Sequence, residues 1–162
     1  MCLEHCKIIQ TEEDIVCYKL FRETAIGTLQ SPLQAYDWVV GKETTDTKSL
    51  NWYYETVFGE CYYTDRLKPY DENDSLNIDR GVFHSFKYLD DAIIYAQTIY
   101  LNSYMKRFVV YQCVIPAKSE LIVEGMFRIS NAYLTESYGS SRIMLTHPVE
   151  YVYPDYVRKI VF

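Results

Sequence analysis

The chain has 162 residues, enough for one domain with a buried core, and 16% of them are aromatic, including 17 tyrosines. Its formal charge of −6 argues against nonspecific binding to nucleic-acid phosphates or anionic lipid. No apolar run reaches membrane-spanning length, the N-terminus lacks the pattern of a secretory signal, and the five cysteines are odd in number and scattered. These features predict a cytoplasmic protein with free thiols, whose tyrosines suit half-buried sheet faces and binding surfaces.

Residues 1–14 show no clear period and are expected to form an N-terminal arm. Cys2, His5 and Cys6 lie close enough in sequence to share a metal ion. A closed zinc site needs a fourth ligand, and none follows at a suitable spacing, so no metal site is expected.

Two β-prone runs follow the arm. Residues 15–22, IVCYKLFR, have the composition of a strand, and residues 34–40, QAYDWVV, alternate loosely before a glycine. A Ser-Pro pair separates the two runs, and residues 42–49 are polar and predict a loop.

Six aromatic side chains crowd into the window from residue 52 to residue 63. One interpretation is a segment that packs its rings into the core, since aromatic side chains are most often buried. The other is a stacking surface for a base, a sugar or a peptide, with Trp52, Tyr54 and Tyr62 as candidate ligand-binding residues. The charged neighbours are mostly acidic rather than basic, which favours core packing.

Residues 65–80 are polar, acidic and interrupted by Pro69, and we expect them to form a mobile loop. If the carboxylates of this segment gather on one face, the protein would be an acidic inhibitor of a nucleic-acid-binding host protein. The carboxylates concerned are Asp65, Asp71, Glu72, Asp74 and Asp79.

The best-defined unit is a strand at residues 82–86, a helix at about 89–106 and a second strand at 108–115. Apolar residues at three- and four-residue spacing give the helix one core-facing side, and Asp90 and Asp91 suit its N-terminus. The almost continuous apolar run of the second strand predicts a central strand that is covered on both faces. If the two strands share a sheet, the unit is a βαβ crossover.

Short β-prone runs recur toward the C-terminus and predict further strands. They lie at residues 120–123, 142–146, 149–153 and 157–161. Between the first two runs, small polar residues at 137–141 predict a loop. Since most elements are strands and only one helix is convincing, residues 1–162 are expected to form a single α+β domain. Its sheet would be mixed or mostly antiparallel, with the main helix packed on it.

Four stretches of the sequence together resemble a group of uncharacterised small proteins from gut bacteria and their phages. They are CYKLFR at 17–22, SPLQAYDWVVGK at 31–42, GVFHSFKYLDDAIIYA at 81–96 and VVYQCVIP at 109–116. Proteins of that group carry the pattern cYK…SP…GK…GxHSF…dA…IP, and the resemblance covers roughly residues 17–146. It implies a bacterial or phage origin and carries no mechanism.

The arrangement also resembles ADP-ribosyltransferase-like domains. In those domains a first strand carries an Arg or His, a strand followed by a helix carries an aromatic residue or Ser, and a later strand supplies a Glu. The resemblance implies an enzyme with NAD as its cofactor and with Arg22, His84, Ser85 and Glu124 as catalytic residues. The sequence lacks the Ser-x-Ser/Thr, Glu-x-Glu and first-strand His-Gly-Thr elements of that pattern. Glu124 is therefore chosen by position alone, and Glu120 and Glu150 are the alternatives.

His84 suggests chemistry of its own. His84 stands just before the helix N-terminus, where anions bind readily. Together with the neighbouring Ser85, it would hold a ligand phosphate or act as a general base. The other interpretation is a half-buried histidine that donates to a backbone carbonyl. A single titratable group without a placed partner favours the second interpretation.

Two functions from different classes follow. The first is a small cytoplasmic binding or interaction protein of a bacterium or its phage, without a cofactor, that acts on a host protein or a nucleotide ligand. It would bind neither membranes nor nucleic acid directly, it is compatible with a homo-oligomer, and it predicts an exposed aromatic patch or a cleft. The second is the NAD-binding enzyme of ADP-ribosyltransferase type. The sequence alone does not decide whether the protein is an enzyme.

Overall fold

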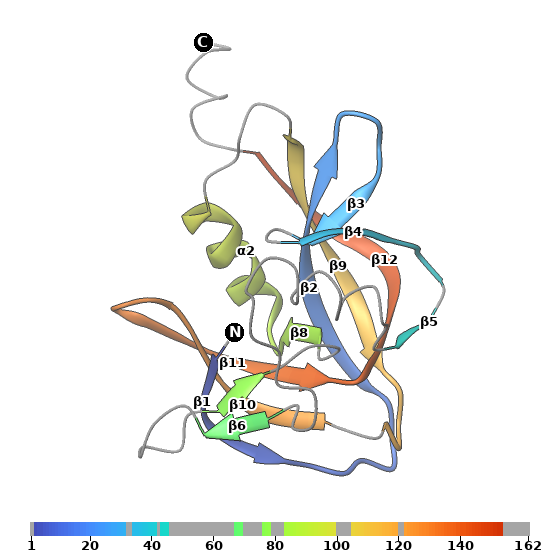
Figure 1. The fold of residues 1–162 in the computed structure, drawn as a ribbon. Helices are drawn as coiled ribbons and strands as arrows, with labels where there is room; N and C mark the ends of the chain where they lie inside the picture. The colour runs from blue at the N-terminus through green and yellow to red at the C-terminus, as the bar shows by residue number, and fades with distance from the viewer. Residues whose placement is uncertain are drawn as a thin grey trace.

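The computed structural model describes residues 2–31, 34–41, 43–45, 67–69, 76–78, 83–99, 105–119 and 122–153. Within these ranges the chain forms a twelve-stranded sheet and one short helix, α2 (Leu89–Thr98) (Figure 1). The strands are β1 (Cys2–Ile8), β2 (Ile15–Thr24), β3 (Leu29–Ser31), β4 (Gln34–Trp38), β5 (Glu43–Thr45), β6 (Leu67–Pro69), β7 (Leu76–Ile78), β8 (Phe83–Phe86), β9 (Met105–Ile115), β10 (Ile122–Ser130), β11 (Tyr133–Ser140) and β12 (Arg142–Val152).

The predicted α+β class is wrong, because the described residues are nearly all β. The helix has 10 residues and ends at Thr98, although its apolar spacing predicted that it would continue to residue 106. Ile99 is already extended, and both its N–H and the Thr98 hydroxyl donate to the Tyr95 carbonyl. Thr98 and Ile99 are β-branched, and such side chains lose rotamer freedom in a helix and favour extended backbone. Met105 and Lys106, which fall inside the predicted helix, lie in β9 instead.

Strand β2 is the centre of the sheet. One of its edges pairs with β9 along its whole length, and the other pairs with β8 near one end and with β3 near the other. Strands β8 and β9 both run antiparallel to β2, so they are parallel to each other with β2 between them. The helix packs over β2 and joins them, so the predicted crossover spans a third strand.

Six strands wrap into a nearly closed barrel in the order β5-β12-β9-β2-β3-β4 (Figure 1). Beyond β4 the chain crosses to β12, where the Gly41 N–H donates to the Leu145 carbonyl at 2.9 Å, and β5 then pairs with β12. Gly41 has φ of 78°, in the left-handed region that favours glycine. This turn therefore closes the barrel between its first and last strands.

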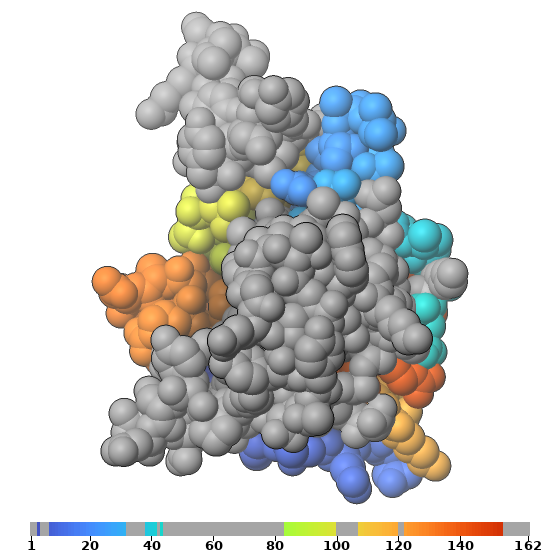
Figure 2. All heavy atoms as spheres, in the orientation of Figure 1, coloured from blue at the N-terminus to red at the C-terminus, as the bar shows by residue number. Residues whose placement is uncertain are grey.

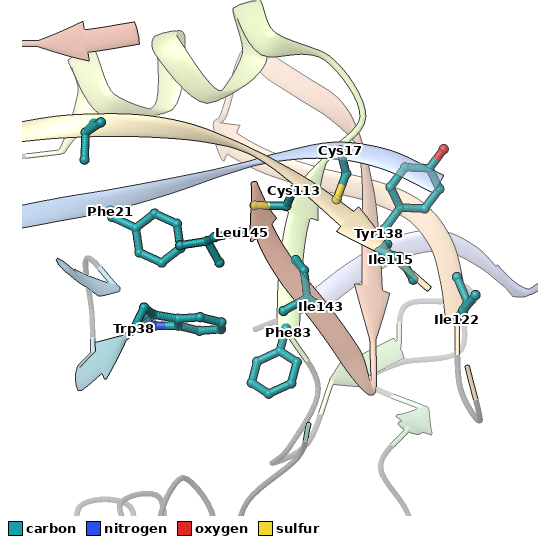
Figure 3. Packing of buried hydrophobic residues seen from close by; sticks show 11 residues of the cluster. Cys17, Phe21, Trp38, Phe83, Cys113, Ile115, Ile122, Tyr138, Ile143 and Leu145 are labelled. Atoms are coloured by element: carbon teal, nitrogen blue, oxygen red, sulfur yellow. The ribbon is translucent and has the colours of Figure 1, made fainter. Parts of the chain in front are cut away.

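Both faces of β2 and β9 are covered, and each face has its own hydrophobic cluster. The inner face, which points into the barrel, carries Cys17, Phe21 and Cys113 (Figure 3). The outer face carries Leu20 and Val110 and packs against α2. Burial on both faces explains why β9 is almost continuously apolar, as the prediction of a central strand required.

The loop predicted at residues 137–141 is also wrong. Residues 137–140 belong to β11, which lies between β8 and β10, and Ser141 marks the corner where the chain turns into β12. Ser137 and Ser140 are fully buried there. The small side chains at this position reflect close packing between strands rather than a turn.

Three segments predicted without strands contain short ones. The predicted loop at residues 42–49 was wrong at β5, which pairs with β12. Within the predicted arm at residues 1–14, β1 pairs with β10 and β7. Strands β6 and β7 fall inside the predicted loop at residues 65–80, and the rest of that segment lies outside the described residues, as does the run at 157–161. These strands are set by pairing with distant parts of the chain, which local composition does not show. None of the helical residues that the structure describes forms a helix long and apolar enough to span a membrane.

Candidate functional site

A cleft of about 540 Å³ opens at one end of the barrel, and we name it the barrel-mouth cleft. The turn between β2 and β3 forms one side, the end of β4 and the link beyond it form a second, and β9 and β12 complete it. Its described lining residues are Glu23, Gly27, Thr28, Leu29, Trp38, Val39, Val40, Arg107, Val109, Tyr111 and Tyr151.

Trp38 forms a tightly packed wall of the barrel-mouth cleft. Its ring packs edge-to-face on Phe21 and on Phe83, each at 5.3 Å between ring centroids. Its indole Nε1 donates to the Ser31 hydroxyl at 2.9 Å, and only 6% of the residue is exposed. A side chain anchored at three points gives the cleft a preformed apolar surface.

The charged part of the lining is an ion pair. Glu23 on β2 and Arg107 on β9 are direct partners in the strand register, and Arg107 Nε donates to Glu23 Oε2 at 2.6 Å. Arg107 also donates to the Tyr153 hydroxyl at 3.0 Å, and its guanidinium carbon lies 3.9 Å from the centre of the Tyr151 ring. The hydrogen bond that Arg107 donates to Glu23, followed by the one it donates to Tyr153, raises the pKa of Arg107. Each charge therefore has its partner inside the protein, and the pair is neutral as a whole.

Exposed apolar side chains surround this opening. Val39, Val40 and Tyr151 line the barrel-mouth cleft and remain 57%, 44% and 43% exposed. Ile26, next to the lining residue Gly27, and Tyr153, bonded to Arg107, are exposed as well. We call Ile26 and Tyr153 the outer rim, since neither lines the cleft.

A lysine lies deeper in the barrel, behind the tryptophan wall. Lys19 follows Cys17 on the inner face of β2, and its Nζ donates to the His84 carbonyl at 2.7 Å. The same ammonium lies 5.4 Å from the Trp38 ring centre and 5.9 Å from that of Phe21. No carboxylate of the described residues pairs with it. Burial lowers the pKa of Lys19 to about 8, because the charged form loses its hydration.

The four residues predicted to be catalytic lie on different faces of the sheet. Arg22 lies on the outer face of β2, and His84 shares that outer face on β8, since Tyr18 is the register partner of Phe86. Ser85 and Glu124 lie on the inner face. Each is a register partner of Tyr138 on β11, which separates their two strands. The structure thus divides these residues between the two faces of the sheet, and the shared NAD site stays a prediction.

Glu124 and His84 lie in different local environments. Glu124 accepts a hydrogen bond from Lys87 at 3.3 Å and lies 3.8 Å from the Lys7 ammonium. His84 is 7% exposed, and its ring lies 4.6 Å from that of Phe86 and 4.5 Å from that of Phe127. Its Nε2 has no hydrogen-bond partner among the residues that the structure describes. Burial, followed by the charge of Lys19, lowers the pKa of His84 well below 6.5, so the ring is neutral at pH 7.

The neutral His84 ring predicts a specific acid sensitivity. Its folded pKa is below the value of about 6.5 expected in the unfolded chain, so the unfolded state binds more protons as the pH falls through that range. Folding stability is therefore lost below about pH 6.5, until the folded pKa is reached. His84→Leu is expected to flatten this loss in urea unfolding curves taken between pH 7 and pH 4. His147→Leu, at an exposed histidine, is the matched control, and equal acid slopes for His84→Leu and the natural protein would contradict the prediction.

Sequence reasoning missed the barrel-mouth cleft. Glu23 and Arg107 are 84 positions apart, and only the register of β2 against β9 makes them partners. Opposite charges at the ends of two predicted strands were the one available signal. Trp52, Tyr54 and Tyr62, the predicted ligand-binding residues, lie outside the described residues, as do the acidic side chains of the inhibitor hypothesis.

The described residues contain no group of three or more His, Cys, Asp or Glu side chains placed to hold a metal ion. No family model matches the chain, no curated protein matches its sequence, and no solved structure matches its fold.

Proposed function

We propose that this is a binding protein and that the barrel-mouth cleft is its ligand site. The observation that carries the proposal is a cleft of about 540 Å³ whose described lining residues include a tightly packed aromatic wall, exposed valines and one internally paired couple of charges. Ligand sites are typically about 300–1,000 Å³, largely apolar, with a few fixed polar groups, and the mouth of a barrel is a common place for them.

The chemistry of the lining supports binding over catalysis. Its described members include no histidine, cysteine or serine, and the carboxylate of Glu23 is held by Arg107 at 2.6 Å. A nucleophile or general base needs a side chain free to take or give a proton beside the reacting atom. The groups present here offer ring faces, apolar contact and a few hydrogen bonds, which suffice to hold a ligand.

The cysteines support a reducing, cytoplasmic location as part of the proposal. Cys17 and Cys113 are direct register partners on neighbouring strands, yet both are free thiols. Two cysteines placed side by side in this way are candidates for a disulfide in an oxidising compartment. The bacterial or phage origin and the host-protein or nucleotide ligand remain part of the same proposal, and the net charge of −6 disfavours nucleic acid.

Nuclear magnetic resonance with indole, a neutral aromatic probe, tests the ligand site. We expect concentration-dependent shifts at the amides of Trp38, Val39 and Val40, and their loss in Val40→Arg, whose side chain would enter the cleft. Leu134→Arg, at an exposed apolar residue of β11 outside the cleft, should leave the shifts unchanged. The proposal would be contradicted if indole shifted only amides outside the cleft, or if Val40→Arg showed the same shifts as the natural protein. Calorimetry with NAD tests the enzyme alternative. That alternative requires a heat of NAD binding in the natural protein and its loss in Arg22→Ala.

A further inference from the structure

The charge of the barrel-mouth cleft restricts what can occupy it, if the proposed function holds. An anionic group would meet the Glu23 carboxylate, and a cationic group would meet Arg107, whose charge is already shared with Glu23 and the Tyr151 ring. Separating the pair to admit a charged ligand would leave one partly buried charge without its partner, which is costly. The fitting occupant is therefore uncharged at the point where it enters.

Arg107 keeps hydrogen-bonding capacity for such a neutral occupant. A guanidinium has five N–H donors, and Arg107 uses Nε for Glu23 and one Nη1 hydrogen for Tyr153. The remaining donors match carbonyl oxygens, and a peptide backbone presents one carbonyl per residue. The lining thus combines an apolar wall for a side chain with donors for the main chain next to it.

The apolar surface is also larger than the cleft. Ile26 is 87% exposed and Tyr153 is 43% exposed, and both belong to the outer rim rather than to the lining. The hairpin between β2 and β3, which carries Ile26, projects from the molecule at the upper right of Figure 2, in blue. A small molecule seated in the cleft would leave this rim in water, whereas a polypeptide lying across the opening would cover it. Apolar patches that extend beyond a pocket in this way are typical of protein interaction sites.

We propose that the occupant is an uncharged, extended segment of another protein, which inserts an aliphatic or aromatic side chain into the barrel-mouth cleft and lays its backbone against Arg107 and the outer rim. This proposal rests on the proposed function and names its partner class. In this arrangement Val40 and Trp38 contact the inserted side chain of the partner, Arg107 donates to the partner's backbone carbonyls, and Ile26 contacts the partner's flanking residues.

A displayed library of random linear peptides, selected on the intact protein, tests the inference. The selected peptides should share one Leu, Ile, Phe or Trp position with uncharged neighbours. Measured by fluorescence anisotropy, their affinity should fall at least about tenfold in Val40→Arg and less, by about threefold, in Ile26→Glu. Leu134→Arg, the same kind of change at an exposed site on β11, should have no effect.

Three results would overturn the inference: no enriched peptide, a shared position that is charged, or full binding to Val40→Arg. Sedimentation of the protein alone adds a fourth, a dimer that Val40→Arg dissociates, which would make a second copy of this chain the occupant. Indole binding distinguishes an error in the partner class from an error in the ligand site itself. If indole binds in a Val40-dependent way and no peptide does, the cleft remains a ligand site and only the partner class is wrong. If neither binds, the proposed function fails as well.

Discussion

Replacing Phe21 with alanine is expected to lower the free energy of unfolding by about 3–5 kcal/mol, the usual cost of removing a buried ring. Phe21 is fully buried and packs edge-to-face on Trp38, at 5.3 Å, and on Tyr111, at 5.8 Å. Both partners also line the barrel-mouth cleft. The cavity left by Phe21 would therefore adjoin the cleft wall, and indole binding should weaken along with stability.

Urea unfolding followed by circular dichroism measures the effect of Phe21→Ala. Ile26→Ala is the matched control, since Ile26 is almost fully exposed and its truncation should change stability by less than about 0.5 kcal/mol. Phe21→Leu keeps most of the buried volume and should cost less than Phe21→Ala. A loss below about 1 kcal/mol for Phe21→Ala would mean that the inner cluster is not packed as described.

Replacing Lys19 with methionine is expected to raise the free energy of unfolding at pH 7 by about 1–2 kcal/mol. Burial lowers the pKa of Lys19 from 10.5 to about 8, and each pKa unit corresponds to about 1.4 kcal/mol between the two protonation states. Methionine fills a similar volume without a charge, although it leaves the His84 carbonyl without the Lys19 donor, which offsets part of the gain.

The same lysine predicts a pH dependence with a definite sign. Between pH 8 and pH 10.5 the unfolded chain keeps the Lys19 proton that the folded protein has lost, so this group adds stability as the pH rises through that range. Burial also raises the pKa of the Cys17 thiol, to about 11, and that of Cys113, and these thiols act in the opposite direction above pH 9. The informative quantity is therefore the difference between Lys19→Met and the natural protein, which should narrow from pH 8 to pH 9. A constant difference, or a variant less stable at pH 7, would contradict the burial of a charged amine.

Local patterns predicted the strands with the clearest composition and failed where distant pairing decides the structure. The apolar run of β9 and the two aspartates in the first turn of α2 were confirmed, because burial on two faces and the helix dipole act on adjacent residues. Ser137 to Ser141 were mistaken for a loop, because serine and glycine mark both turns and close strand packing. The helix was predicted to extend to residue 106 but ends at Thr98, because apolar spacing does not show where the backbone becomes extended to enter the next strand.

The candidate site was beyond local patterns for a related reason. The sequence directed attention to His84, whose position before the helix resembled an anion site, whereas the structure buries its ring between Phe86 and Phe127. The barrel-mouth cleft is assembled from residues of β2, β4, β9 and β12, each unremarkable in its own segment. Only closure of the barrel places them around one opening.

The pairing of β2 with β9 has a consequence for synthesis. Thr24 pairs with Met105 and Ile15 pairs with Ile115, so residues of the central strand meet their partners only after 81 to 100 further residues have been added. Domains dominated by such distant contacts fold in milliseconds to seconds, well behind helical ones of similar size. A nascent chain therefore carries β2 without that partner during most of translation, and yield in the cell is expected to depend on chaperones that shield it until β9 leaves the ribosome.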